Sequence, residues 1–163
     1  MASATKLSFH KRLFLQLIAF SWTIVVCFIG FQYLREKEYK SGFLSAQLQQ
    51  YNRHLLVAIE DGESYEEYIA SHEKPFDDLR ITLITLSGAV IFDNTIPADS
   101  LGNHSNRPEI VDAFKDGSGY HIGRQSESDG REYFYSATRG ERVVVRTAIP
   151  YSNTLYDLLA ADW

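Results

Sequence analysis

The residues best suited to chemistry lie between positions 103 and 119, where the chain reads NHSNRPEIVDAFKDGSG. Histidine, asparagine, arginine and glutamate together are typical of metal sites, catalytic sites and anion-binding loops. The same stretch also fits the start of a helix. Pro108 suits a first helical turn, where its missing N–H has no intrahelical partner, and Glu109 favours the positive end of the helix dipole. We therefore interpret the stretch chiefly as a structured start of a helix.

Spacing gives little support to metal binding or catalysis. The histidines and acids do not fall at intervals such as His-x-x-x-His, which hold zinc. The chain also lacks the Gly-x-Ser-x-Gly turn that exposes a nucleophilic serine. We predict no catalytic residue, no metal site and no cofactor in this chain. We expect His104 to organise its loop by donating hydrogen bonds to backbone carbonyls.

A ligand pocket is the other interpretation of the polar residues. Guanidinium groups match carboxylates and small anions, and aromatic side chains line many ligand sites. The candidate ligand-binding or switch residues are His104, Arg107, Arg124, Tyr133, Tyr135 and Arg146. The alternative, which we favour at this point, is that the tyrosines fill the core and the arginines pair with Asp93, Asp112 and Glu132.

The longest apolar segment spans residues 13–34 and contains no charged residue. About 20 apolar residues in a helix cross a bilayer, whereas the core of a cleaved signal peptide has about 7 to 15. We therefore predict a retained transmembrane helix. Residues 1–12 contain Lys6, Lys11 and Arg12 and no acid. Positive charge favours the cytoplasmic side, so we predict a cytoplasmic tail at 1–12 and an extracytoplasmic main domain.

Charge and cysteine content restrict the partners further. The chain has 163 residues, with 21 acids against 16 lysines and arginines. All the acids follow residue 35, so the predicted outer part is strongly acidic. Nucleic-acid binding needs clustered basic residues, and we exclude nucleic acid as a partner. The single cysteine, Cys27, lies in the apolar segment, so no disulfide can form within the chain.

Residues 35–75 form a predicted helical segment outside the membrane. Leu44, Leu48, Tyr51 and Leu55 are spaced 4, 3 and 4 apart, the pattern of one helix face. The pattern lasts about two heptads, which is short for a coiled coil. Two interpretations stay open: this stripe packs on its own domain, or it contacts the partner helix of a homodimer and carries a signal. A second, short helix is predicted to start after Ser64, its N-cap.

From residue 80 onward, alternation replaces helical spacing. We predict strands at 80–86, 89–93, 119–128, 131–138 and 141–150, joined by tight turns at Ser87-Gly88, Asp129-Gly130 and Arg139-Gly140. Two strands, a connection with a short helix, and a three-stranded meander follow the helical segment. This order predicts an α+β fold, with a PAS-like (PDC/Cache-type) five-stranded antiparallel sheet over residues 76–151.

The motif order resembles the extracytoplasmic sensor region of phosphate-regulon-type (PhoR-like) bacterial sensor histidine kinases. The resemblance covers roughly residues 80 to 150. It rests on Ser87-Gly88, Asp93-Asn94, Asn103-His104, Arg107-Pro108-Glu109-Ile110, Gly117-Ser118-Gly119 and Arg124-Gln125-Ser126. It implies a signal-input module of the bacterial inner membrane, followed by a second span and a kinase core that acts on a response regulator. The chain stops at Trp163, before those parts. We expect truncation, with residues 152–163 beginning the helix to the missing second span.

Two alternatives use the same features. One is an anchored envelope domain that binds a partner and transmits nothing. The other is the sensor domain of a different receptor, such as a cyclic-dinucleotide synthase or a chemoreceptor. In the interpretation that we favour, the chain is a membrane-anchored homodimer that detects an unknown small ligand or envelope protein.

Overall fold

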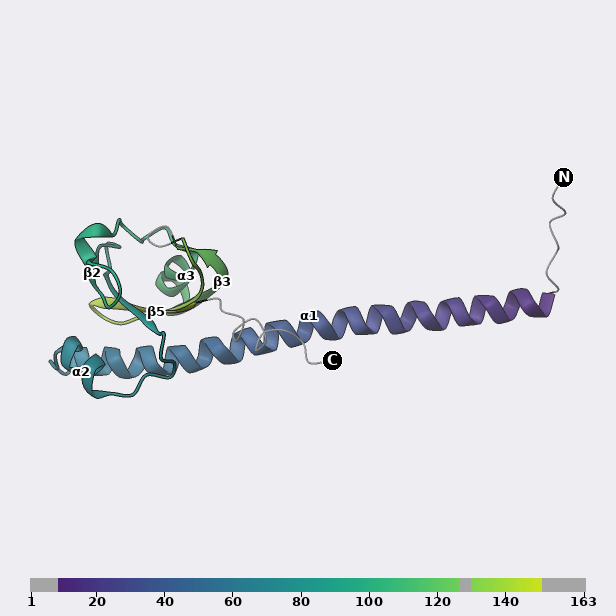
Figure 1. Cartoon of the computed structure of the whole chain (residues 1–163), viewed down its shortest axis with the longest axis horizontal. Helices are drawn as coiled ribbons and strands as arrows, with labels where there is room; N and C mark the ends of the chain where they lie inside the picture. The colour runs from purple at the N-terminus through teal and green to yellow at the C-terminus, as the bar shows by residue number, and fades with distance from the viewer. Residues whose placement is uncertain (1–8, 127–129, 151–163) are drawn as a thin grey trace.

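A very long helix and a five-stranded antiparallel sheet make up this α+β molecule (Figure 1). The computed structural model describes residues 9–126 and 130–150. The predicted helix at 152–163, most of the predicted tail and part of the predicted Asp129-Gly130 turn lie outside these residues. The sheet lies against the C-terminal end of the long helix, and the N-terminal half of that helix extends away from it (Figure 1).

Helix α1 runs without a break over Phe9–Glu60. The sequence has no proline in this range, so nothing removes a hydrogen bond from the helix interior. Its N-terminal half is long and apolar enough to cross a membrane and is not buried by the rest of the chain. A signal sequence would have the same properties. The helix ends at Glu60. Gly62 follows it with φ +90°, and Glu63 N donates to Ala58 O at 2.9 Å.

Helix α2 covers Tyr65–Ser71 and begins as the sequence predicts. The Ser64 hydroxyl accepts a hydrogen bond from the Glu67 N–H at 3.4 Å, which satisfies one of the free donors of the first turn. The Tyr68 ring then meets Tyr51 of α1 edge-on, with ring centroids 6.5 Å apart. This contact holds the short helix against the long one.

The sheet contains the five predicted strands, with bounds that differ by a few residues. They are β1 (Arg80–Thr85), β2 (Val90–Asp93), β3 (Ser118–Gln125), β4 (Glu132–Arg139) and β5 (Val143–Pro150). Their order is β2-β1-β5-β4-β3, and all neighbours are antiparallel. The first and last strands therefore meet in the centre, where Thr82 pairs with Arg146.

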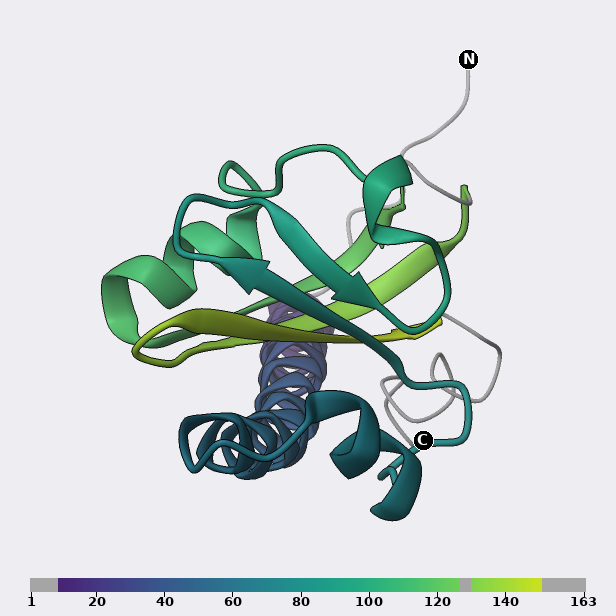
Figure 2. The same ribbon diagram turned by 90° about the vertical axis from the view of Figure 1, so that its left-hand side faces the viewer.

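One face of the sheet packs on α1 and forms the main hydrophobic core. Because side chains alternate along a strand, every second residue of the central strands points to this helix. Ile81, Leu83, Phe134, Val145 and Ile149 form one buried cluster with Leu44, Leu48 and Leu55 of α1. Figure 2 shows the sheet between α1 and α2 on one side and α3 with the connecting segment on the other.

The opposite face carries helix α3 (Pro108–Asp116) and the short 3₁₀ helix η1 (Ala98–Ser100). Pro108 occupies the first turn of α3, as the sequence predicts. Ile110 and Ala113 pack on a small cluster made by Ile84, Ala137 and Val144. Helix α3 covers only one end of this face. On the rest of the face, the central strands contact the segment that connects β2 to α3.

The stripe formed by Leu44, Leu48, Tyr51 and Leu55 packs on the chain's own sheet. The exposed fractions of these side chains are 1%, 0%, 8% and 0%. The first of the two interpretations therefore describes this structure. A homodimer remains a prediction, and the same side chains would have to leave the sheet to form its contact.

Truncation of the stripe tests how firmly α1 is fixed to the sheet. We expect Leu48→Ala to lower the free energy of unfolding by about 2–5 kcal/mol, because it opens a cavity in the main core. Val57→Ala is the matched control on the same helix, since Val57 is 55% exposed; its effect should stay within about 0.5 kcal/mol. Urea unfolding of the full chain in mild detergent, followed by near-ultraviolet circular dichroism, measures both. Equal effects would contradict this packing.

Candidate functional site

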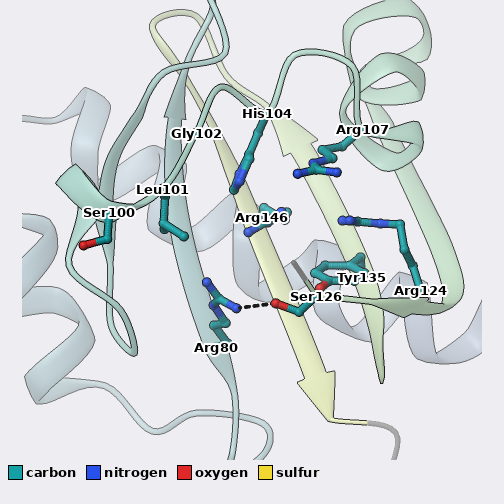
Figure 3. Close-up of a pocket in the computed structure, with 10 residues that line it drawn as sticks. All are labelled: Arg80, Ser100, Leu101, Gly102, His104, Arg107, Arg124, Ser126, Tyr135 and Arg146. Atoms are coloured by element: carbon teal, nitrogen blue, oxygen red, sulfur yellow. Dashed lines mark hydrogen bonds between the residues drawn. The ribbon is translucent and has the colours of Figure 1, made fainter. Parts of the chain in front are cut away.

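A cavity of about 210 Å³ lies on the sheet face that carries α3. Its walls come from strands β1, β3, β4 and β5 and from the segment between β2 and α3. The residues that line it are Arg80, Ser100, Leu101, Gly102, His104, Arg107, Arg124, Ser126, Tyr135 and Arg146. Figure 3 shows the guanidinium groups and the His104 ring around one space.

Strand pairing brings Arg80, Tyr135 and Arg146 to this face. Arg146 pairs with Thr82, and its Nη2 donates to Thr82 Oγ1 at 3.2 Å. Tyr135 pairs with Ala148 on the next strand, so its ring lies on the same face. Both side chains are almost fully buried, with exposed fractions of 1% for Tyr135 and 3% for Arg146.

Arg124 reaches the cavity through an irregularity in β3. Tyr120 and Ile122, which share its parity, lie on the α1 side: the Tyr120 ring stacks on Phe134, and Ile122 packs on the main core. The register shifts between His121 and Arg124, and Gly123 adopts φ +67°. A bulge of this kind turns the following side chain to the other face. Arg124 therefore points into the cavity.

The segment before α3 is held against the β1–β2 turn. Asn103 Nδ2 donates to Ser87 O at 2.9 Å, and its Oδ1 accepts from Ser105 N at 2.9 Å. The backbone N–H of His104 donates to Gly88 O at 2.8 Å. Gly88 has φ +88°, and a Cβ there would lie 2.6 Å from Ser105 N. Glycine is therefore required for this close approach.

The role expected for the His104 ring is wrong. Backbone groups and Asn103 hold the loop, and within the described part of the chain the ring makes no hydrogen bond to a carbonyl. His104 is 6% exposed, and its buried Nδ1 has no hydrogen-bond partner among the described residues. The ring instead forms part of the cavity wall.

Two buried carboxylates pair with three of the arginines. Arg80 Nε donates to both Asp93 oxygens, at 3.2 and 2.9 Å. Glu109 Oε1 accepts from Arg124 Nη2 at 2.7 Å and lies 3.5 Å from Arg146 Nη1. The side chains of Asp93 and Glu109 are fully buried. The expected partners of Arg124 and Arg146 were Asp93, Asp112 and Glu132, and this expectation is corrected: both pair with Glu109.

Aromatic rings lie beside the arginines of the cavity. The guanidinium carbon of Arg124 lies 4.2 Å from the Tyr135 ring centroid, and that of Arg146 lies 5.1 Å from it. Both distances are within the range of cation–π attraction. Tyr133 lies next to Tyr135, 6.0 Å from the Arg80 guanidinium, but outside the cavity wall. Five of the six candidate residues thus meet at one cavity, and sequence reasoning missed Arg80, Ser126 and Glu109.

Burial shifts the pKa values of two groups in the cavity wall, Arg146 and His104. Burial lowers the pKa of Arg146 to about 10, although Glu109 opposes the shift, so this group stays protonated. Burial lowers the pKa of His104 to about 3, and the charges of Arg146, Arg107, Arg124 and Arg80 add to the effect. The imidazole is therefore neutral. Among the described residues, Asp93 pairs with Arg80, and Glu109 pairs with Arg124 and Arg146.

Comparison with known proteins does not assign the chain to a family. No protein-family model matches it, and a search of the curated proteins finds no match. The arrangement of this cavity therefore has to be interpreted from its own chemistry.

Removal of the shared carboxylate tests the charge balance. We expect Glu109→Gln to destabilise the fold by about 3 kcal/mol, because Arg124 and Arg146 would stay buried beside a neutral amide. Asp112→Asn is the matched control, since it removes an exposed carboxylate from the same helix; its effect should stay within about 0.5 kcal/mol. Thermal and urea unfolding of the full chain in detergent measure both. Similar losses in the two variants would mean that Glu109 has no special role.

Burial of neutral His104 predicts a specific pH dependence. The folded-state pKa of about 3 lies below the usual value of 6.5, so the unfolded chain binds an extra proton between these two pH values. The free energy of unfolding should therefore decrease as the pH falls below about 6.5, by up to about 1.4 kcal/mol per pH unit from this group.

Replacement of the ring tests this contribution. His104→Gln should flatten the pH profile of stability between pH 6.5 and 4, whereas His54→Gln, at an exposed position of α1, should keep the wild-type slope. Urea midpoints measured at several pH values give the comparison. Parallel profiles for the wild type and His104→Gln would show that the imidazole is protonated in the folded protein.

Proposed function

We propose that the chain is the membrane-anchored, extracytoplasmic signal-input module of a bacterial two-component sensor histidine kinase of the PhoR-like type. The observation that carries the proposal is the continuity of α1. One uninterrupted helix, Phe9–Glu60, includes the apolar segment and the buried stripe beneath the sheet. The outer face of the same sheet carries the charged cavity (Figure 3).

The PAS-like part of the proposal rests on the element order. Two antiparallel strands, a connection with a short helix, and a three-stranded meander agree with the fold expected for such a module. The preceding helical segment agrees with it too. The proposed location is the bacterial inner membrane, with residues 1–12 in the cytoplasm because they carry the positive charge.

The proposed mechanism is a two-state equilibrium. A ligand or envelope protein that binds one arrangement of the sheet better than another shifts the population toward it. The central strands present alternate residues to the two faces: Arg146 lies at the cavity, and its neighbour Val145 packs on α1. The residue of β5 at the cavity is thus next in the chain to a residue that packs on α1, the helix that is proposed to enter the membrane. The kinase core and the response regulator belong to the part of the pathway beyond this chain.

The reading frame of the source DNA beyond the codon for Trp163 provides the first test. We expect a second apolar span within about 25 residues, since about 20 apolar residues cross a bilayer, and then a phosphoacceptor helix and an ATP-binding domain. A stop codon directly after Trp163 would leave an anchored binding domain, and the proposal would be wrong. A synthase or chemoreceptor domain after the second span would keep the input module and replace the output.

A helix break tests the route within that longer protein. Glu38 is exposed on α1 between the apolar segment and the stripe. Glu38→Pro should remove the response of autophosphorylation to its stimulus, because proline interrupts the helix. Glu38→Ala removes the same charge and should preserve the response. An unchanged response in the proline variant would exclude α1 as the route.

A further inference from the structure

Strand β3 forms one edge of the sheet and has eight residues, whereas β2 at the opposite edge has four. An edge strand presents backbone N–H and C=O groups that have no partner in the sheet, and proteins protect long edges with lysines, prolines or bulges. Strand β3 contains no lysine or proline, and its bulge lies near its C-terminal end, at Gly123. The part from Ser118 to His121 is therefore a regular edge without such protection.

The pairing of β3 with β4 shows which backbone groups of this edge point outward. Arg139 N donates to Gly117 O at 2.9 Å, so these two residues form a hydrogen-bonded pair. Hydrogen-bonded and non-hydrogen-bonded pairs alternate along antiparallel strands. Gly119 is therefore bonded to β4, whereas the backbone groups of Ser118 and Tyr120 point away from it. Among the described residues, no other element forms a backbone hydrogen bond with these two.

An open groove of about 600 Å³ follows the same edge. It is lined by Asp112 and Asp116 of α3 and by residues 118–122 of β3. Helix α3 forms one wall because it lies beside β3 (Figure 1). At about 3.3 Å per residue, the strand residues of the groove make an edge roughly 16 Å long, which fits an added strand of about five residues.

The two sides of this edge differ in chemistry. Gly119 faces α3, since a Cβ there would lie 2.5 Å from the Asp112 Cβ. The next residue, Tyr120, faces the other way: its ring stacks on Phe134 at 5.9 Å and is 37% exposed. Asp112 and Asp116 are exposed and make no ion pair within the described residues. An added strand would place alternate side chains beside two carboxylates and beside an exposed aromatic ring.

We infer that β3 binds an extended, basic segment of a partner protein as an additional strand, with lysines or arginines toward α3 and apolar side chains toward Tyr120. In complexes of this kind, main-chain hydrogen bonds give affinity and alternate side chains give specificity. The inference deepens the proposed function, since it names a class of envelope protein that the module would detect. It rests on that function only for what binding would signal.

A second copy of the chain is the other occupant that strand pairing allows. Antiparallel pairing of two β3 strands would bring Asp112 and Asp116 of both copies to one face of the joined sheet. Like charges across such an interface are destabilising. All 21 acids of the chain follow residue 35, so the rest of the predicted outer part would add to the repulsion. Charge therefore favours a basic partner over a second copy.

Titration calorimetry on the full chain in a nonionic detergent tests the inference. The probe is acetyl-KVKVKVK-amide, in which lysine and valine alternate. Acetyl-EVEVEVE-amide reverses the charge, and acetyl-KKKVVVK-amide keeps the composition without the alternation. We expect saturable one-to-one binding of the alternating basic peptide, with both controls at least about tenfold weaker. Binding should weaken as salt is added, because salt screens exposed charge pairs.

Matched variants locate the binding at β3. Asp112→Asn combined with Asp116→Asn should weaken the peptide about fivefold, since exposed ion pairs are individually weak. Asp77→Asn combined with Asp78→Asn removes the same charge from an exposed loop and should leave the affinity unchanged. Tyr120→Pro removes an outward N–H without removing a bond to β4 and should abolish binding. Tyr120→Ala also removes the ring but keeps the N–H, so its binding should stay measurable.

Modified peptides test the main-chain bonds on the unchanged protein, whatever the stability of the proline variant. Two versions of the alternating basic peptide carry backbone N-methyl groups, one on the lysines and the other on the valines. Because only alternate N–H groups of a strand face its neighbour, one version should lose binding and the other should keep it. The version that fails also gives the direction of the added strand.

Four outcomes would overturn the inference. They are no saturable binding of the alternating basic peptide, equal affinity for either control peptide, equal affinity of the two methylated versions, and equal losses in the two double variants. A dimer of the wild type that Tyr120→Pro converts to a monomer, measured by sedimentation, would assign the edge to a second copy and would overturn it too.

Failure of the proposed function looks different. Hydrogen exchange of residues 41–60, measured with and without the bound peptide, reports on α1. Binding that protects residues 118–122 and leaves residues 41–60 unchanged would preserve the strand-addition site and remove its link to the membrane helix.

Discussion

A buried guanidinium group at the centre of the sheet sets the main constraint on this molecule. Arg146 is 3% exposed on the strand that pairs with both β1 and β4. A charge in this position is tolerated only with nearby acceptors and counter-charge. Glu109 provides the carboxylate, and Thr82 provides an acceptor hydroxyl. This requirement determines the position of α3, because Glu109, the second residue of that helix, has to reach Arg146 on the sheet. The loop before α3 is in turn fixed by Asn103 and Gly88.

The side chains on the two faces of the same strands lie in two different environments. Toward α1 they present Ile81, Leu83, Phe134 and Val145, which form an apolar layer. Toward α3 they present Arg80, Tyr135 and Arg146, which form a charged one. Strand alternation alone produces this division. The apolar layer supplies stability that offsets the cost of burying charged groups on the other face.

Local features of the fold could be predicted from the sequence, whereas the residues of the candidate site could be predicted only in part. The Ser64 cap, the helix start at Pro108 and the order of the five strands each depend on neighbouring residues, and the structure confirms them. Arg80 was missed because its place beside the cavity depends on the pairing of β1 with β5, far apart in the chain. Glu109 was assigned to the helix dipole, since no local pattern shows that two distant arginines converge on it. Simple alternation would have put Arg124 on the wrong face, because the bulge at Gly123 is a property of the paired strands.

The contacts between α1 and the sheet limit the kinds of motion that could carry a signal. Protein cores are close-packed and resist gradual deformation, so the helix and the sheet are expected to move as bodies. Two polar contacts fix their alignment: Asn52 Nδ2 donates to Thr138 Oγ1 at 3.3 Å, and Glu141 N donates to Glu60 Oε1 at 3.1 Å. Both lie at the far end of α1 from the apolar segment. Sliding along the axis would break both, whereas tilting about this end would preserve them and be magnified along the rest of the helix. The geometry therefore favours tilting over a piston-like shift.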